Sequence, residues 1–230
     1  CFLPSDKITC NNCLKKNKAW MIENSWSYDI NQWRAPFDLL LKEATTLEFF
    51  DQSTVEIIKK EFKISKSKIK INPHTAVKYN QEKISLPKSF IHLGLFGNLT
   101  VHKGGMVINE LADYFDKNNL NIPITLIGST YLPLNKKIKF TGSYKSEDLP
   151  ILVKDSGINL VFISSIVPET FSFTLSEAMA LDLPVLAFDI GAQGNRLKKY
   201  NRGYLIKLNS TVEEIYKKIK FIEKRENLCE

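Results

Sequence analysis

Two carboxylates, Glu169 and Glu177, lie eight residues apart in a segment rich in small hydroxyl residues, PETFSFTLSEA at 168–178. An apolar run at 158–163 precedes the segment and another at 184–188 follows it, so the pattern predicts strand, loop, helix and strand. Glu169 then lies in the loop and Glu177 about one turn into the helix. The start of such a helix attracts phosphate, because its first N–H groups are unpaired and its dipole is positive there. Carboxylates accept hydrogen bonds from sugar hydroxyls, so the segment predicts a joint site for diphosphate and sugar.

Each carboxylate also has an ordinary structural interpretation. Thr174 and Glu177 have the spacing of a capping box, in which the Glu side chain only bonds a backbone N–H at the helix start. Glu169 taken alone is typical of a solvated loop carboxylate. The motifs around the segment favour the ligand-binding interpretation of both residues.

Segment 168–178 resembles the Glu-x7-Glu motif of retaining glycosyltransferases with the GT-B fold, of the large family 4 type. The resemblance extends over roughly residues 90–206 and implies an α/β fold. This fold would have a Rossmann-like parallel sheet with helices on both faces, the C-terminal half of a GT-B fold, preceded by a partial N-terminal domain. Three further stretches also resemble the family and occur in the family's order along the chain: KKIKFTG at Lys136–Gly142, SEDL at Ser146–Leu149 and LPVLAFDIGA at Leu183–Ala192.

A glycine-bounded loop at residues 97–104 resembles the family's loop that clamps the donor diphosphate. Lys103 and Gly104 match the family pattern, whereas Asn98 stands where the family has Arg. This departure removes one fixed positive charge, although Asn still donates hydrogen bonds and His102 would supply part of the charge. It bears on donor affinity more than on the fold.

The resemblance implies catalytic roles for Lys103 and Glu169. Lys103 and the amides near residues 172–174 would stabilise charge on the leaving diphosphate, and Glu169 would hold sugar hydroxyls. Glu177 would hold the ribose, and the base would lie near residues 143–144. No metal is implied, because the sequence has no Asp-x-Asp pair and Lys103 with the helix dipole takes the cation's role. The implied donor-binding set is Gly97, Asn98, His102, Gly104, Gly128, Ser143, Tyr144, Phe171, Ser172, Phe173, Thr174 and Glu177.

The implied activity is transfer of a sugar, of hexosyltransferase type, from a nucleotide-diphosphate donor of unknown base to a glycan or lipid-linked acceptor. The resemblance implies that no cofactor is required. Segments 168–178 and 188–192 look most like bacterial surface-polysaccharide or O-antigen enzymes, which implies polysaccharide biosynthesis in the cytoplasm. A lipid-linked acceptor would allow peripheral association with the inner face of the membrane. The alternative is a non-catalytic nucleotide-binding or scaffold module derived from a glycosyltransferase, supported by Asn98 and opposed by the presence of Glu169 and Glu177.

Composition excludes several other classes. The chain has 230 residues, 43% hydrophobic and 25% charged, which is ordinary for a globular protein, and no apolar run is long enough to cross a bilayer. The net charge of +7 comes from scattered lysines, so a nucleic-acid partner is not expected. There is neither a full dinucleotide fingerprint nor a Walker sequence, which disfavours nicotinamide and ATP chemistry.

Cys10 and Cys13 have the spacing of a metal knuckle, which is half of a zinc site. Cys1 would be a third ligand of a structural zinc. Reduced cytosolic thiols are the equally supported interpretation. A zinc-knuckle nucleic-acid binder is the rival function that these cysteines and the basic charge would support.

The pattern predicts a helix led by Ser53 or Thr54 through Phe62 and a strand at 68–71. Beyond the linker it predicts strands at 90–96, 122–127 and 138–141, a helix capped by Ser146, and a last helix opened by a capping box of Ser210 and Glu213. Asp182 stands where the family often has Gly and predicts a left-handed turn.

Three domains are expected: residues 1–85 as the remnant of an acceptor-side domain and its linker, 86–207 as the donor-binding domain, and 208–230 as a C-terminal helix. The chain begins with Cys rather than Met, so we expect a fragment of a longer protein. Because a GT-B site lies between two domains, the fragment alone is expected to be inactive.

Overall fold

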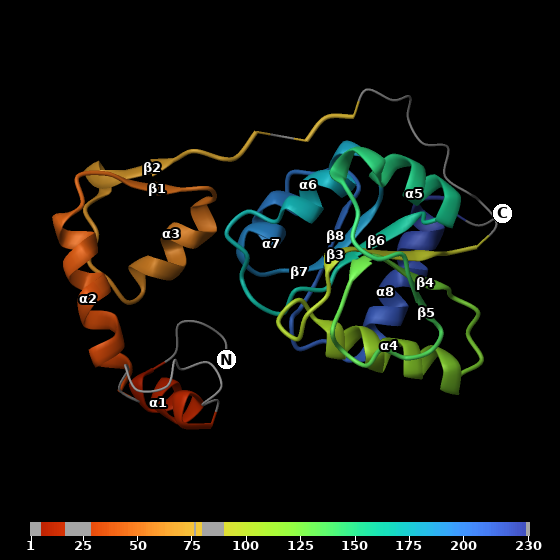
Figure 1. Cartoon of the computed structure of the whole chain (residues 1–230), viewed down its shortest axis with the longest axis horizontal. Helices are drawn as coiled ribbons and strands as arrows, with labels where there is room; N and C mark the ends of the chain where they lie inside the picture. Colours follow the sequence, from red (N-terminus) through yellow and green to blue (C-terminus); the bar gives the residue numbers. More distant parts are fainter. Residues whose placement is uncertain (1–5, 17–28, 76, 80–89, 229–230) are drawn as a thin grey trace. The chain divides into compact units, whose positions relative to one another are not determined.

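The computed structural model describes residues 6–16, 29–75, 77–79 and 90–228. The chain divides into two units, Cys1–His74 and Thr75–Glu230, each of which is described by itself. The first runs from red to orange in Figure 1 and the second from yellow to blue.

The second unit is built on a six-stranded sheet in the order β5-β4-β3-β6-β7-β8, and every neighbouring pair is parallel. Chain order therefore reverses between β3 and β6, which lie side by side at the centre. In an open parallel sheet this reversal point, outside the carboxyl ends of the strands, is where ligands bind. The strands are β3 (Leu93–Asn98), β4 (Ile124–Ser129), β5 (Ile138–Phe140), β6 (Leu160–Ile163), β7 (Val185–Phe188) and β8 (Gly203–Ile206).

Helices cover both faces of this sheet (Figure 1). Strands β6 and β7 are apolar and buried at every position, because alternate side chains enter two different cores. Leu160 and Phe162 pack toward α4 and α8, whereas Val161 and Ile163 pack toward the other helices. The predicted Rossmann-like sheet with helices on both faces is confirmed. The helices are α4 (Gly105–Lys117), α5 (Leu149–Ser156), α6 (Phe173–Ala180), α7 (Gly191–Leu197) and α8 (Val212–Arg225).

The helix boundaries correct two predictions in this unit. The capping box of α8 is formed by Thr211 and Glu214, one residue later than predicted, with the Glu214 N–H 3.3 Å from the Thr211 hydroxyl. Ser146 does not cap a long helix. It opens the short 3-10 turn η3 (Ser146–Asp148), after which α5 begins at Leu149 with Pro150 in its first turn. Proline suits this position because the first N–H groups of a helix are unpaired.

The first unit contains a two-stranded parallel sheet, in which β1 pairs with β2. The predicted strand at 68–71 is confirmed as β2. The predicted cap at Ser53 or Thr54 is wrong: Asp51 caps α3, and its carboxylate accepts the Ser53 N–H at 2.8 Å. The elements are α1 (Lys7–Lys16), α2 (Ile30–Glu43), β1 (Leu47–Phe49), α3 (Gln52–Lys59), η2 (Lys66–Lys68) and β2 (Ile69–Ile71).

The predicted domain boundaries stay predictions. The expected linker lies mostly at residues 80–89, outside the described ranges. The last helix, α8, packs on α4 through Ile215, Ile219 and Ile222, which are buried in the same core as the sheet. Among the described helices, none combines the length and hydrophobicity that a membrane span requires.

Candidate functional site

Two loops meet at the reversal point of the sheet: the β3 loop, residues 99–104, and the β6 loop, residues 164–172. The Ser164 hydroxyl donates to the Lys103 carbonyl at 2.8 Å, and the Ile166 N–H donates to the His102 carbonyl at 3.0 Å. Gly104 has a φ of 85°, and a Cβ there would lie 2.0 Å from the Ser164 carbonyl oxygen. Glycine is therefore needed for the two loops to approach this closely.

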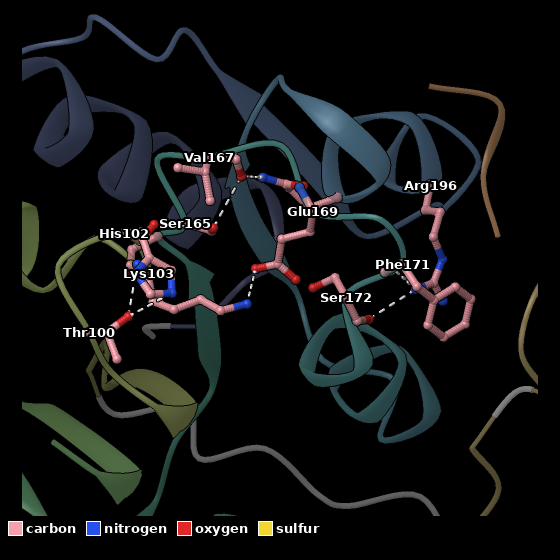
Figure 2. A network of polar contacts seen from close by, with 11 residues as sticks. Thr100, His102, Lys103, Ser165, Val167, Glu169, Phe171, Ser172 and Arg196 are labelled. Carbon is pink, nitrogen blue, oxygen red and sulfur yellow. Dashed lines mark hydrogen bonds and ion pairs between the residues drawn. The ribbon is translucent and has the colours of Figure 1, made fainter. Parts of the chain in front are cut away.

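Lys103 and Glu169 are 66 residues apart in sequence, and their side chains meet at this site (Figure 2). The Lys103 ammonium lies 2.8 Å from Glu169 Oε1, and the Glu169 side chain is only 9% exposed. The interpretation of Glu169 as a solvated loop carboxylate is thus wrong. An ammonium and a carboxylate in contact here offer a cation for phosphate and an acceptor for hydroxyl groups.

The backbone of Glu169 is held by α7. The buried Gln193 side chain accepts the Glu169 N–H at 3.0 Å and donates to the Val167 carbonyl at 3.0 Å. The Ala192 N–H donates to the Glu169 carbonyl at 2.9 Å. These contacts fix the backbone from which the Glu169 carboxylate extends toward Lys103.

The start of α6 lies beside the same loops, as the sequence predicted. Ser172 is its N-cap, so the amides near residues 172–174 are at the helix N-terminus. A Cβ on Gly97 would lie 3.1 Å from the Thr174 methyl carbon, which places the end of β3 against this helix start. Phe171 is buried, whereas Phe173 is 57% exposed.

Arg196, on α7, braces the turn into α6. Its guanidinium donates to the carbonyls of Phe171 at 2.6 Å and Ser172 at 3.0 Å, and to the Ser176 hydroxyl at 2.8 Å. It also lies 4.1 Å from the centre of the Phe171 ring. Sequence reasoning missed both Arg196 and Gln193, because no spacing pattern marks side chains that act only through tertiary contacts.

Three further predicted residues belong to the end of β3, the β3 loop and β4. Asn98 is exposed at the end of β3 and is in register with Ser129. A ring nitrogen of His102 lies 3.2 Å from the Thr100 hydroxyl oxygen. A Cβ on Gly128 would come 1.8 Å from the Gly97 carbonyl oxygen, so Gly128 allows the close approach of β4 to β3.

Glu177 belongs to a second cluster that includes Tyr144 and Ser146. Its two carboxylate oxygens accept the hydroxyls of Tyr144 and Ser146, both at 2.8 Å, and the residue is 8% exposed. Burial and the adjacent Glu177 carboxylate raise the pKa of the Tyr144 phenol. The capping-box interpretation of Glu177 is wrong, because α6 already begins at Phe173 and Glu177 bonds side chains instead. Ser143 is exposed beside this cluster.

Two predictions outside the donor site have different outcomes. Asp182 has the expected left-handed φ, 55°, just after α6. Cys10 and Cys13 lie one turn apart on α1, with Cys10 buried, but Cys1 is outside the described residues. Within the described ranges, no group of three or more ligating side chains is placed to hold a metal. The zinc site therefore stays a prediction.

Comparisons with known proteins give the family and the fold of the chain. The model of the family described as glycosyl transferases group 1 matches residues 80–230. No curated protein matches the chain. Among solved structures, HepE of Anabaena with UDP-glucose is similar at 19% identity and a TM-score of 0.60, over 86% of this chain and 59% of that chain.

Two further structures are similar over most of the chain. The lipopolysaccharide outer core galactosyltransferase WaaB, in apo form, matches at 16% identity and a TM-score of 0.63, over 98% of this chain and 66% of that one. A mutant of TarM from S. aureus, in complex with fondaparinux, α-GlcNAc-glycerol and UDP, is also similar. It has 17% identity and a TM-score of 0.67, over 85% of this chain and 40% of that chain. The expected C-terminal half of a GT-B fold is confirmed, and the chain spans 59% of the length of HepE.

Proposed function

This chain belongs to the group 1 glycosyl transferases, and from that premise we propose that it forms the donor-binding half of a retaining enzyme using a nucleotide-diphosphate sugar. The contact that carries the proposal is the 2.8 Å pair of Lys103 and Glu169 at the reversal point of the sheet. A cation and a buried carboxylate beside a helix N-terminus suit a diphosphate joined to a sugar.

In the proposed reaction, the bond between the anomeric carbon and the diphosphate oxygen breaks, and its electron pair leaves with the diphosphate. Negative charge grows on that oxygen, where the Lys103 ammonium and the first amides of α6 stabilise it. The acceptor oxygen forms the new bond to the anomeric carbon on the same face, and its proton passes to the departing diphosphate. Glu169 accepts hydrogen bonds from sugar hydroxyls and orients the ring.

Glu177 is proposed to bind the ribose, with the base beside residues 143–144. The Tyr144 and Ser146 hydroxyls already occupy one lone pair on each Glu177 oxygen. Each carboxylate oxygen has a second acceptor site, so a ribose hydroxyl can bind without displacing either contact. We propose UDP as the first nucleotide to test, because UDP or a UDP-sugar is bound in the HepE and TarM structures.

The acceptor is proposed to be a glycan or a lipid-linked glycan, and the process bacterial surface-polysaccharide or O-antigen synthesis at the cytoplasmic face of the membrane. The resemblance of segments 168–178 and 188–192 to such enzymes supports this part. We also propose that residues 1–230 alone transfer no sugar, because the described part of the first unit holds a two-stranded sheet, which is too small for an acceptor domain.

Substitution of Lys103 tests the proposal. Lys103→Ala should weaken UDP binding by about 10-fold or more, since a charge-assisted hydrogen bond contributes roughly 1.5–3 kcal/mol. UMP binding should change little, because the lysine is proposed to contact the second phosphate. Isothermal titration calorimetry gives both affinities.

Lys137→Ala is the matched control, since Lys137 is an exposed lysine paired with Asp116 at the opposite end of the sheet. It should bind both nucleotides as the wild type does. Equal weakening of UDP and UMP by Lys103→Ala would show that Lys103 is only a general surface charge. A scaffold module would instead bind nucleotide but show no donor turnover in the whole protein.

A further inference from the structure

The backbone of Ser172 is unusual for its residue type. Four non-glycine residues in the described ranges have positive φ: Asn119, Ser172, Asp182 and Asn227. The three Asn and Asp residues follow the ends of α4, α6 and α8, where a left-handed residue commonly closes a helix. Ser172, with φ 68° and ψ 86°, instead precedes a helix. A side chain in this region is strained, and such strain in folded proteins gathers at functional sites.

The Ser172 hydroxyl is also unfavourable for stability, because it is buried without a hydrogen-bond partner. Ser172 is 5% exposed, and its Oγ is the one buried side-chain polar atom in the described part of the chain that lacks a hydrogen-bond partner. An N-cap serine ordinarily accepts an N–H of the first helical turn, but no such bond is formed here. Buried hydroxyls are nearly always paired, so this one is expected to meet a partner in the bound state.

The surroundings fix where this hydroxyl points. Arg196 holds the Phe171 and Ser172 carbonyls on one side of the turn. Figure 2 shows the Ser172 hydroxyl on the other side, turned toward Glu169 and Lys103. The buried hydroxyl therefore lies on the side of the turn where the diphosphate is proposed to bind. Substitution by glycine would remove both the backbone strain and the unpaired hydroxyl, so stability alone does not account for serine here.

We propose that the Ser172 hydroxyl donates a hydrogen bond to the second phosphate of the donor, as a binding contact additional to Lys103 and the α6 amides. The inference rests on the proposed function and names one more group that recognises the diphosphate. Phosphate oxygen is the partner that this position favours, because the hydroxyl lies at the positive end of α6 and on the side of the turn that faces the Lys103–Glu169 pair (Figure 2). It would also compensate for the neutral Asn98 on the β3 side.

The test compares stability with affinity in the complete 230-residue chain. Ser172→Gly should raise the melting temperature without ligand by about 2–4 °C, because it relieves the left-handed strain. The same variant should weaken UDP binding by about 10-fold while UMP binding is unchanged. Ser172→Ala should lose the same UDP affinity without the gain that glycine gives to the backbone.

Asn119→Gly is the matched control, since Asn119 is exposed, has a φ of 54° and follows α4 away from the site. It should change UDP affinity not at all. If both Ser172 variants bind UDP as the wild type does while Lys103→Ala loses affinity, the hydroxyl proposal is overturned and the proposed function stands. If Lys103→Ala also binds normally, or the wild type binds no nucleoside diphosphate, the proposed function fails together with the hydroxyl contact.

Discussion

Glu169 has a buried side chain, a backbone clamped by Gln193 and an ion pair with Lys103. In the whole enzyme, Glu169→Gln should lower kcat on the order of 100-fold, by analogy with removing one aimed group from a transition state. The substitution keeps the shape of the side chain, so KM for the donor should change less than kcat. Steady-state kinetics with the nucleotide sugar measure both constants.

Gln52→Glu provides a charge-changing control, since Gln52 is an exposed residue of α3 in the other unit. It should leave kcat unchanged. A Glu169→Gln enzyme with wild-type kcat would remove Glu169 from the reaction and reduce it to a structural partner of Lys103.

Single residues were predictable from sequence where their types and spacing form a motif. Lys103 and Glu169 belong to motifs, and the structure brings them together. The role of Arg196 could not be predicted, because it binds carbonyl groups of a turn that is distant in sequence. The lack of a partner for the Ser172 hydroxyl could not be predicted either, because it accompanies a positive φ that the sequence does not reveal. Glu177 was expected near a ligand, but its bond with the Tyr144 hydroxyl depends on a tertiary contact.

The first residues of α7 brace the β6 loop, and Gly191 makes this possible. It has a φ of 53°, and a Cβ there would lie 2.6 Å from the Pro168 Cα and 2.7 Å from the Glu169 nitrogen. Gly191→Ala should therefore destabilise the fold by about 2–4 kcal/mol and weaken UDP binding, because the loop that carries Glu169 must move. Urea unfolding and calorimetry measure the two effects.

Gly142→Ala is the control that separates the backbone strain of a left-handed residue from a steric clash of the added Cβ. Gly142 has a similar left-handed φ of 87°, but nothing lies within 4 Å of a Cβ at that position. It should cost only about 1–2 kcal/mol of stability. If Gly191→Ala costs no more than Gly142→Ala, α7 does not brace the loop through this contact.

Elements were predictable from the period of apolar residues, but their ends were not. The stripe on α4 that includes Ile108, Leu111 and Phe115 is buried as the pattern indicates. The caps at Ser53 or Thr54 and at Ser210 were wrong by one to three residues, since Asp51 and Thr211 take those positions. Several neighbouring residues in each case can act as a cap, and tertiary packing of the helix face decides among them.

At the level of the whole chain, the alternation of strands and helices predicted the donor-binding unit, and the comparisons confirm its fold. The first unit was predicted only in outline, because the strands described in it, β1 and β2, are three residues each and carry little periodic information. Its interpretation as the remnant of an acceptor domain stays a proposal.

The measurement that tests the central claim most directly is a thermal-shift panel of UDP, GDP, dTDP, ADP and CDP on the 230-residue chain. A ligand that binds only the folded state adds about 2.7 kcal/mol at 100 times its Kd, which corresponds to a rise of roughly 5–10 °C for a chain of this size. One nucleoside diphosphate should give such a shift, and the Lys103→Ala chain should lose most of it. If none of the five raises the melting temperature at millimolar concentration, this chain is not a donor-binding half.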